Sequence, residues 1–467
     1  MRPRARPAAL AIMLMVSAAG CRAAPQHYDQ GAEDRLSAAG PTGQRIRLDA
    51  RIDGDWWSIF GSPKLDDVVR HAVAGNPDLE AADARIAQAR DAVAVARGGL
   101  RPQVDLVAAG GRERSAIGAH TSSFYAIGPQ VSFDFDLFGG TRRLVEQQSA
   151  IARLAQHRFD AAYLTLTGSV ARQAILLASA RAQLDAVELL IADDRRTLEL
   201  VQAAHRHGSV TQVDEALATS QLAQDQTLLP PLAQQRDVAL HALSILAGQG
   251  PADWISPVFD LANFTLPTEL PVSLPSDLAR DRPDILAAEA ELDAASASIG
   301  IATADLYPQL RVSASLSRAG VGSGVDTLWG IAAGLAAPIF HGGSLKANRA
   351  AAVDGYRATL ADYRQTIVEA LGQIADILQS IDHDGEEYAA QQRALDAAES
   401  SLRLNRGGYG AGEIGVLQVL DAERAYQRAL LGQIRARTAR YLDVVDLSVA
   451  LGGNTNGAFA HSRVAAK

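Results

Sequence analysis

Two kinds of hydrophobic spacing alternate along this chain, and each predicts a different secondary structure. Apolar residues recur at helical spacing over 65–72, after a Ser62-Pro63 start, and the helical pattern continues over 81–96. Over 131–137 the spacing changes to every second residue, with valine, phenylalanine and leucine alternating with serine and aspartate. This alternation predicts a strand with one apolar face and one acidic face.

Three further segments show the same alternation, at 310–317 and, in weaker form, at 104–108 and 328–340. Together with 131–137 they predict four strands in two hairpins, one in each half of the chain. On these strands, Asp134, Asp136, Arg311 and several serines form a polar face opposite the apolar one.

A very long helix is predicted after each hairpin. No proline lies between Pro129 and Pro230. The pattern from 141 to about 205 predicts one uninterrupted helix of roughly 100 Å, at about 1.5 Å per residue. Glycine-containing turns near Gly208 and Gly412 then reverse the chain into shorter return helices. We expect Pro230-Pro231 to break the first return helix, because proline clashes with the preceding turn.

The two halves are related as an internal repeat. Residues 76–82 and 100–104 each have a counterpart 206 positions later, and Gly412 lies 204 positions after Gly208. A shared register over such distances indicates a tandem duplication of a unit of about 200 residues. The expected divisions are a signal peptide (1–20), a lipidated N-terminal segment (21–61), a first repeat (62–247), a connector (248–275), a second repeat (276–452) and a C-terminal tail (453–467).

The N-terminus carries a targeting signal. Three early arginines, a short apolar stretch and small residues at 17–20 predict a secretory signal peptide. Cys21 follows directly, as at a bacterial lipoprotein acylation site, and we expect its thiol to be acylated. An ordinary cleavage site that happens to precede a cysteine is the alternative. Arg22, in the position where an inner-membrane retention signal has aspartate, favours the outer membrane.

Composition excludes several classes of function. The 467 residues carry a formal charge of −9, which does not favour a nucleic-acid partner, and one cysteine rules out a disulfide framework. Neither a P-loop nor a H-E-x-x-H motif occurs, and the histidines lack metal-ligand spacing. The glycines of 408–412 follow a predicted helix, so they indicate a helix–helix turn. We expect no enzyme, no cofactor and no metal site.

Four strands are too few to close a membrane barrel by themselves, since the smallest such barrels have about eight. After Cys21 no apolar run of about 18 residues could form a spanning helix. Two copies would supply eight strands and three copies twelve, with apolar faces toward lipid and polar faces toward a watery lumen. A soluble antiparallel sheet, with helices covering its apolar face, is the alternative that the pattern leaves open.

Several motifs together resemble one known family. They are the segment 56–66, which contains Trp56-Trp57, the segment Asn76–Leu79, Tyr307-Pro308, the glycine pair after each hairpin, and Gly412 with the segment Val419–Ala422. The chain resembles TolC-like outer-membrane efflux lipoproteins of the NodT/OprM type over nearly its whole mature length. The resemblance implies a mainly α homotrimer, with a 12-stranded outer-membrane β-barrel continuous with a 12-helix periplasmic α-barrel.

The resemblance also implies a function and partners. Such a protein is the passive exit channel of a tripartite efflux pump, exporting drugs or other small molecules. Its partners are outer-membrane lipid, a periplasmic adaptor of the membrane fusion class, and an inner-membrane pump, commonly of the resistance-nodulation-division class. Type I protein secretion, metal efflux and a non-conducting lipoprotein scaffold are the alternatives.

The resemblance places the functional residues at the helical tips, where the tube is pinched shut. By position it implies an aperture lined by Asp421, Gln418 and Leu417, of which only Asp421 is charged. Contacts of the closed state are implied for Asp214, Tyr409 and Ile414. The residues implied to touch the adaptor are Gly208, Ser209, Val210, Thr211, Gly412, Glu413, Ile414 and Gly415.

Overall fold

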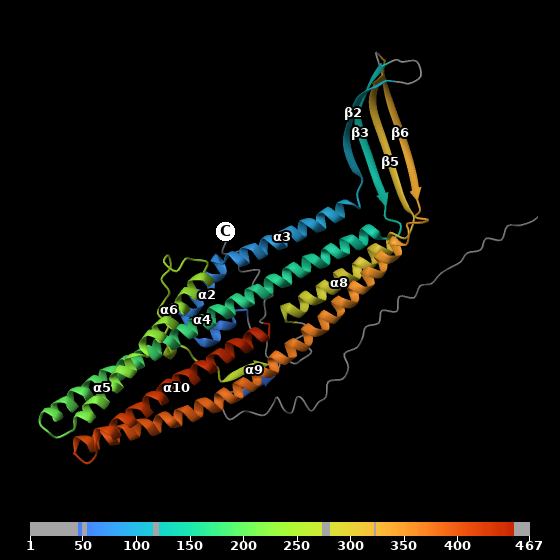
Figure 1. The fold of residues 1–467 in the computed structure, drawn as a ribbon. Coiled ribbons are helices and arrows are strands. Elements are labelled where there is room, and N and C mark those ends of the chain that lie inside the picture. The colour runs from blue at the N-terminus through green and yellow to red at the C-terminus, as the bar shows by residue number, and fades with distance from the viewer. Residues whose placement is uncertain (1–44, 49–53, 115–120, 273–280, 322–323, 453–467) are drawn as a thin grey trace, which may run out of the picture. The chain divides into compact units, whose positions relative to one another are not determined.

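The computed structural model describes residues 45–48, 54–114, 121–272, 281–321 and 324–452. Helices dominate it (Figure 1). The N-terminal segment forms a short 3-10 helix, η1 (Trp56–Phe60). The helices of the first repeat are α2 (Pro63–Gly75), α3 (Pro77–Gly98), α4 (Gly140–Arg206), α5 (Gln212–Gln226) and α6 (Leu229–Leu246). Those that follow are η2 (Leu261–Asn263), α8 (Pro283–Ala304), α9 (Ser344–Gly410) and α10 (Val416–Ala450).

The sequence predicts one continuing helical pattern at the start of the first repeat. The structure instead has two helices there, α2 and α3. Asn76 lies between α2 and α3 in an extended conformation, and its side chain accepts hydrogen bonds from the backbone N–H groups of Asp78 and Leu79 at 2.9 and 3.2 Å. Pro77 follows at the first helical position. An asparagine cap followed by proline starts a new helix here, because both supply what a helix N-terminus needs.

The duplicated positions Asn76 and Arg282 hold equivalent junctions. The Asn76 side-chain amide donates to the Leu246 carbonyl, at the end of α6, at 3.0 Å. The Arg282 guanidinium donates to the Ala450 carbonyl, at the end of α10, at 2.7 Å. Each residue thus ties the start of its repeat to the last carbonyls of its return helix, which otherwise lack intrahelical partners.

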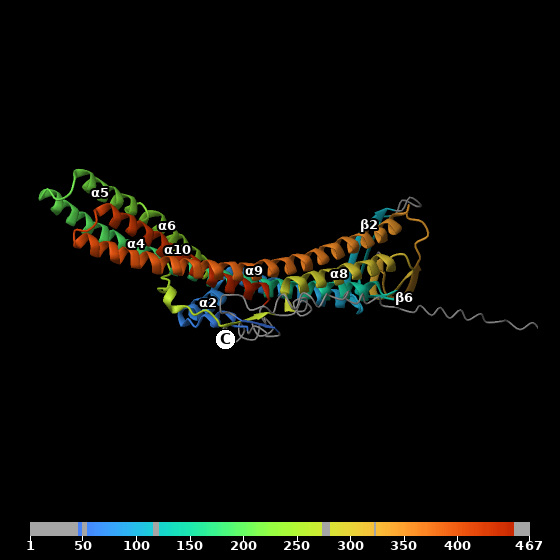
Figure 2. The same ribbon diagram turned by 90° about the horizontal axis from the view of Figure 1, so that it is seen from below.

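The long helices agree with the sequence prediction, and α4 and α9 are each 67 residues long. Along the chain α3 packs on α4, α4 on α8, and α8 on α9. The return helices α5 and α6 pack on α4, and α10 packs on both α9 and α4 (Figure 2). The first return helix is interrupted at Thr227–Leu228, just before Pro230, and the two prolines lie in the first turn of α6. They therefore begin a helix instead of simply ending one.

The four long strands form one antiparallel sheet in the order β2-β3-β5-β6. They are β2 (Gln103–Arg114), β3 (Thr121–Phe135), β5 (Gln309–Val321) and β6 (Gly324–Ala336). The register pairs Val131 with Val104 and Ala314, so the apolar positions of neighbouring strands share one face, as the alternation predicts. The alternation predicts a strand that runs to Leu137, but β3 ends at Phe135.

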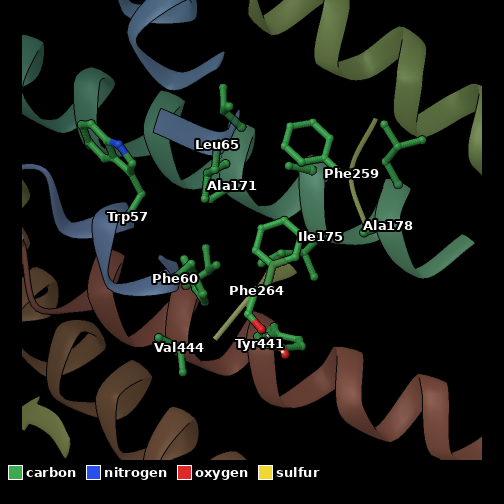
Figure 3. Close-up of a cluster of buried hydrophobic side chains, with 14 of the residues drawn as sticks. Trp57, Phe60, Leu65, Ala171, Ile175, Ala178, Phe259, Phe264, Tyr441 and Val444 are labelled. Atoms are coloured by element: carbon green, nitrogen blue, oxygen red, sulfur yellow. Dashed lines mark hydrogen bonds between the residues drawn. The ribbon is translucent and has the colours of Figure 1, made fainter. Parts of the chain in front are cut away.

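One aromatic cluster anchors the N-terminal segment and the connector onto the long helices (Figure 3). Trp57, Phe60 and Phe264 are almost fully buried, together with Tyr441 of α10. The Tyr441 hydroxyl donates to the Phe264 carbonyl at 2.8 Å. Beside this cluster, β1 (Arg45–Leu48) pairs in parallel with β4 (Glu269–Val272) of the connector, a pairing that the sequence pattern does not predict.

Candidate functional site

The two hairpin tips are built by the same backbone turn. Gly208 and Gly412 have φ values of +71° and +75°, in the left-handed region that favours glycine. After the first glycine, the Ser209 N–H donates to the Ala204 carbonyl at 2.9 Å, and after the second, the Glu413 N–H donates to the Gly408 carbonyl at 2.9 Å. These bonds close the end of each long helix and fix the reversal that the sequence predicts.

The helices that leave the two turns start differently. The Thr211 hydroxyl accepts from the Asp214 N–H, and the Asp214 carboxylate accepts from the Thr211 N–H at 2.8 Å, so α5 begins with a capping box. The Thr211 hydroxyl also donates to the Asp214 carboxylate at 2.7 Å, and this bond, followed by the one from the Thr211 N–H, holds the pKa of Asp214 below its ordinary value. Gly415 occupies the equivalent position before α10 and offers no side-chain cap.

The three predicted closed-state residues lie near one another in the two tips. Burial, followed by the charge of Asp214, raises the pKa of the Tyr409 phenol. The hydrogen bonds of the Asp214 carboxylate nevertheless go to Thr211, and a bond to Tyr409 stays a prediction. Ile414 is half-buried and lies over Gly408, where an added Cβ would be 3.5 Å from its side chain. The tip of α9 and α10 is therefore packed by an apolar contact.

The predicted aperture residues are on the exposed side of α10. The Asp421 side chain is 63% exposed, and its carboxylate forms an ion pair with Arg424 at 3.2 Å. Leu417 and Gln418 are also exposed, one turn nearer the tip. Their place at an aperture stays a prediction, but the structure adds Arg424, which the sequence reasoning missed. An arginine three residues after an aspartate on a helix is the signal that could have found it.

The eight residues predicted to contact an adaptor lie at the turns themselves. Val210 and Ile414 are half-buried, and the other six are exposed. Beneath them, Val201, Ala218, Val416 and Leu420 form a small buried apolar cluster from α4, α5 and α10. This cluster joins the two hairpins, so the exposed turns sit on a packed support.

A buried polar cluster lies farther along the same helices, and sequence reasoning missed it. Asp194 of α4 and Asp225 of α5 are each 4% exposed, and Glu423 of α10 is 3% exposed. Burial, and then a hydrogen bond with Asp225, raises the pKa of Asp194 to about 8. Burial also raises the pKa of Glu423. Hydrogen bonds from Arg406 and Thr197 lower that pKa, but burial outweighs them.

A second buried carboxyl group lies between α9 and α10. Asp443 is 9% exposed, and burial, then the charges of Asp384 and Asp446, raises its pKa to about 7. Asp446 is itself ion-paired with Arg172 of α4. These groups show that the long helices are joined by titratable contacts as well as apolar ones.

On the sheet, the predicted polar residues are only partly brought together. Asp134 and Arg311 face each other across β3 and β5 and form a bidentate ion pair at 2.5 and 2.8 Å. Asp136, beyond the end of β3, instead accepts from the Thr141 and Arg142 N–H groups at 3.1 and 3.0 Å and so caps α4. A carboxylate is favoured there by the helix dipole.

Two sequence predictions concern membrane association. Cys21 and the signal peptide lie outside the described residues. Among the described residues, no helix is both long enough and apolar enough to cross a bilayer.

The sequence profile of the outer membrane efflux protein family matches residues 68–249 and 274–453. The pyoverdine export outer membrane protein OpmQ of Pseudomonas aeruginosa is 32% identical over 457 residues, which cover 93% of this chain and 94% of that protein.

Solved structures agree with this relationship. The outer-membrane channel OprN is 26% identical, with a TM-score of 0.83 over 90% of this chain and 96% of that chain. The open state of the MtrE outer membrane channel of Neisseria gonorrhoeae is 27% identical, with a TM-score of 0.80 over 90% and 96% of the two chains. The chain therefore belongs to the outer membrane efflux protein family and has the TolC-like fold of its channels.

Proposed function

We propose that this outer-membrane efflux protein acts as a homotrimeric exit conduit for small organic molecules, with an aperture at its helical tips. The conduit passes molecules without chemical change. The name of the OpmQ relative describes pyoverdine export, which supports an export function.

The order of the elements is the observation that carries the proposal. The strands run β2-β3-β5-β6, and the helices at their bases pack in the matching order α3, α4, α8, α9. Within the described residues β2 and β6 each pair with one strand only, so the sheet is open at both edges. Because β2 belongs to the first repeat and β6 to the second, the open edge of one copy suits the opposite edge of another.

The exposure of the sheet supports a membrane location for it. Leu106, Trp329 and Ile331 are 73–76% exposed and lie on the apolar face, which the described part of the chain leaves uncovered. Contact with lipid would bury this face, and unpaired strand edges in lipid would cost several kcal/mol per group. Pairing β6 of one copy with β2 of the next removes those edges. Two or three copies could close, and the family resemblance favours three.

The partners that we propose follow from the exposed turns. The exposed turns at Gly208 and Gly412 offer a periplasmic adaptor two similar surfaces per chain, six in a trimer. The adaptor would connect the conduit to an inner-membrane pump of the resistance-nodulation-division class.

Conductance in planar lipid bilayers tests the proposed function. Purified full-length protein should produce discrete conductance steps whose size is reproducible between insertions. A non-conducting scaffold would bind the membrane without any steps, and that result would refute the proposal.

Asp421→Ala should raise single-channel conductance and weaken cation selectivity. The substitution removes three carboxylates from the proposed aperture and leaves Arg424 without its ion-pair partner, so the local potential becomes more positive. Reversal potentials in a salt gradient measure the selectivity. Glu413→Ala, which removes an exposed carboxylate from the turn, is the matched control, and equal effects of both variants would place Asp421 away from the aperture.

Cys21→Ser should abolish acylation completely, because serine has no thiol to accept the lipid. Incorporation of a labelled fatty acid into the protein measures this directly. The protein should still be secreted, since the signal peptide is unchanged. Label retained on the variant would show that the lipidation prediction is wrong.

A further inference from the structure

The Asp194 and Asp225 carboxyl groups form a hydrogen-bonded pair between α4 and α5. The Gln427 side-chain amide donates to Asp225 Oδ1 at 2.8 Å, and the Gln221 amide donates to Asp225 Oδ2 at 2.7 Å. Both oxygens of Asp225 are thus acceptors, and a bond between two carboxyl groups needs a proton on one of them. The two carboxyl groups therefore share one proton, and through Gln427 the same pair reaches α10.

The charges around this pair do not neutralise it. Asp193 of α4 and Glu423 of α10 face it and add negative potential. Arg406 of α9 forms ion pairs with Asp193 at 3.0 Å and Glu423 at 3.1 Å. Arg424 of α10 bonds Gln221 and Asp421. Both cations are thus bound to other partners, and within the described residues the buried Asp194 Oδ2 atom has no hydrogen-bond partner.

Linkage gives the sign of the pH effect. Because the pKa of Asp194 is about 8 in the fold, against 3.8 for the free side chain, the folded arrangement binds the proton more tightly. Its stabilising contribution is complete below about pH 4 and is lost as the pH rises toward 8. Above pH 8 the bond between the carboxyl groups is gone, and two buried negative charges face each other beside Glu423.

The pair lies at the base of the tip hairpins. Asp194 precedes Gly208 by 14 residues, roughly 21 Å at about 1.5 Å per helical residue, with the apolar tip cluster of Val201, Ala218, Val416 and Leu420 between them. Asp225 lies in the last turn of α5, next to the break before α6. Loss of the contact between Asp194 and Asp225 therefore releases the C-terminal end of α5 from α4.

We propose that the Asp194–Asp225 pair is a proton-operated clasp, which holds α5 and α10 on α4 when protonated and lets the tips part when the proton leaves. The proton passes to water, and repulsion between the carboxylates then favours a hydrated, more open arrangement. The link from the clasp to the aperture rests on the proposed function.

Hydrogen exchange of the full-length protein in detergent, from pH 5 to pH 9, tests the clasp. After correction for the intrinsic exchange rate, the equilibrium constant for local opening of segments 212–226 and 416–427 should increase by up to about tenfold per pH unit. This increase should level off near pH 8. Asp194→Asn can donate the same hydrogen bond without a titratable proton, so its opening should stay low at every pH. Glu188→Gln removes an exposed carboxylate from α4 and should keep the wild-type profile.

A wild-type profile that is flat, or a pH-dependent profile that persists in Asp194→Asn, would overturn the clasp. Planar bilayer recordings separate this outcome from failure of the channel. The wild-type open probability should rise with pH and that of Asp194→Asn should not. If the exchange behaves as expected but the protein conducts at no pH, the clasp holds and the proposed conduit is wrong.

Discussion

Phe60→Ala should lower the free energy of unfolding by about 3–5 kcal/mol, the usual cost of removing a buried phenylalanine. Phe60 is 0% exposed, and its ring packs edge-on against Phe264 and Tyr441 at centroid distances of 6.2 and 6.3 Å. Its carbonyl also accepts from the Thr265 N–H at 3.0 Å. The residue thus joins the N-terminal segment, the connector and α10, and alanine would leave a cavity among all three.

Urea unfolding followed by tryptophan fluorescence measures this loss, since Trp56 and Trp57 are buried beside Phe60. Tyr441→Phe is the matched variant, because it keeps the ring and removes only the hydroxyl that donates to the Phe264 carbonyl. It should cost about 1–3 kcal/mol, the penalty for an unsatisfied buried group. A Phe60→Ala protein that unfolds at the wild-type urea concentration would contradict the anchoring role of this segment.

Arg282→Met should destabilise the second repeat by about 1–3 kcal/mol, since it removes a buried guanidinium and leaves the Ala450 carbonyl and the Gln373 side chain without this donor, while the Asp284 side chain, 44% exposed, can turn to water. Arg282 is 8% exposed and forms a bidentate bond with Asp284 at 3.0 and 2.7 Å. It also donates to the Ala450 carbonyl and to the Gln373 side chain, which joins α8 to α10 and α9. Burial opposes the charge of Asp284, but hydrogen bonding from Arg282 outweighs it and holds the pKa of Asp284 below its ordinary value.

Arg282→Lys separates charge from geometry, because lysine keeps the positive charge but lacks the planar fork. It should lose part of the stability that Arg282→Met loses, as measured by thermal unfolding of the helices. If the lysine variant matches the wild type, charge alone explains the junction. If the methionine variant also matches it, the junction does not stabilise the repeat.

The parts of the fold that follow one periodicity could be predicted from the sequence. The 67-residue helices and the two glycine turns each depend on a local pattern, and their bounds are close to those predicted. The four strands are also predicted, but the alternation covers only part of each strand, and β3 begins at Thr121, well before the predicted start at 131. The errors lie where two local signals compete. Asp136 continues the strand alternation, yet the start of α4 needs its carboxylate as a cap, so the strand ends one residue earlier.

The candidate site was harder to predict, because burial on a long helix depends on which neighbours cover it. Asp193 and Asp194 are adjacent acidic residues followed by two arginines, a pattern typical of a solvated helix face. Only the packing of α5 and α10 against α4 buries Asp194 and leaves Asp193 beside Arg406. Likewise, no local pattern links β1 to β4, because parallel pairing between distant segments leaves no signal in either one.

The mass of the protein in a mild detergent, measured by light scattering with the detergent contribution subtracted, tests the central claim most directly. Four strands per chain, open at both edges of the sheet, require more than one chain to close, and the family resemblance predicts a particle containing three chains. A single chain, stable and monodisperse under these conditions, would contradict the shared conduit on which the proposed function depends.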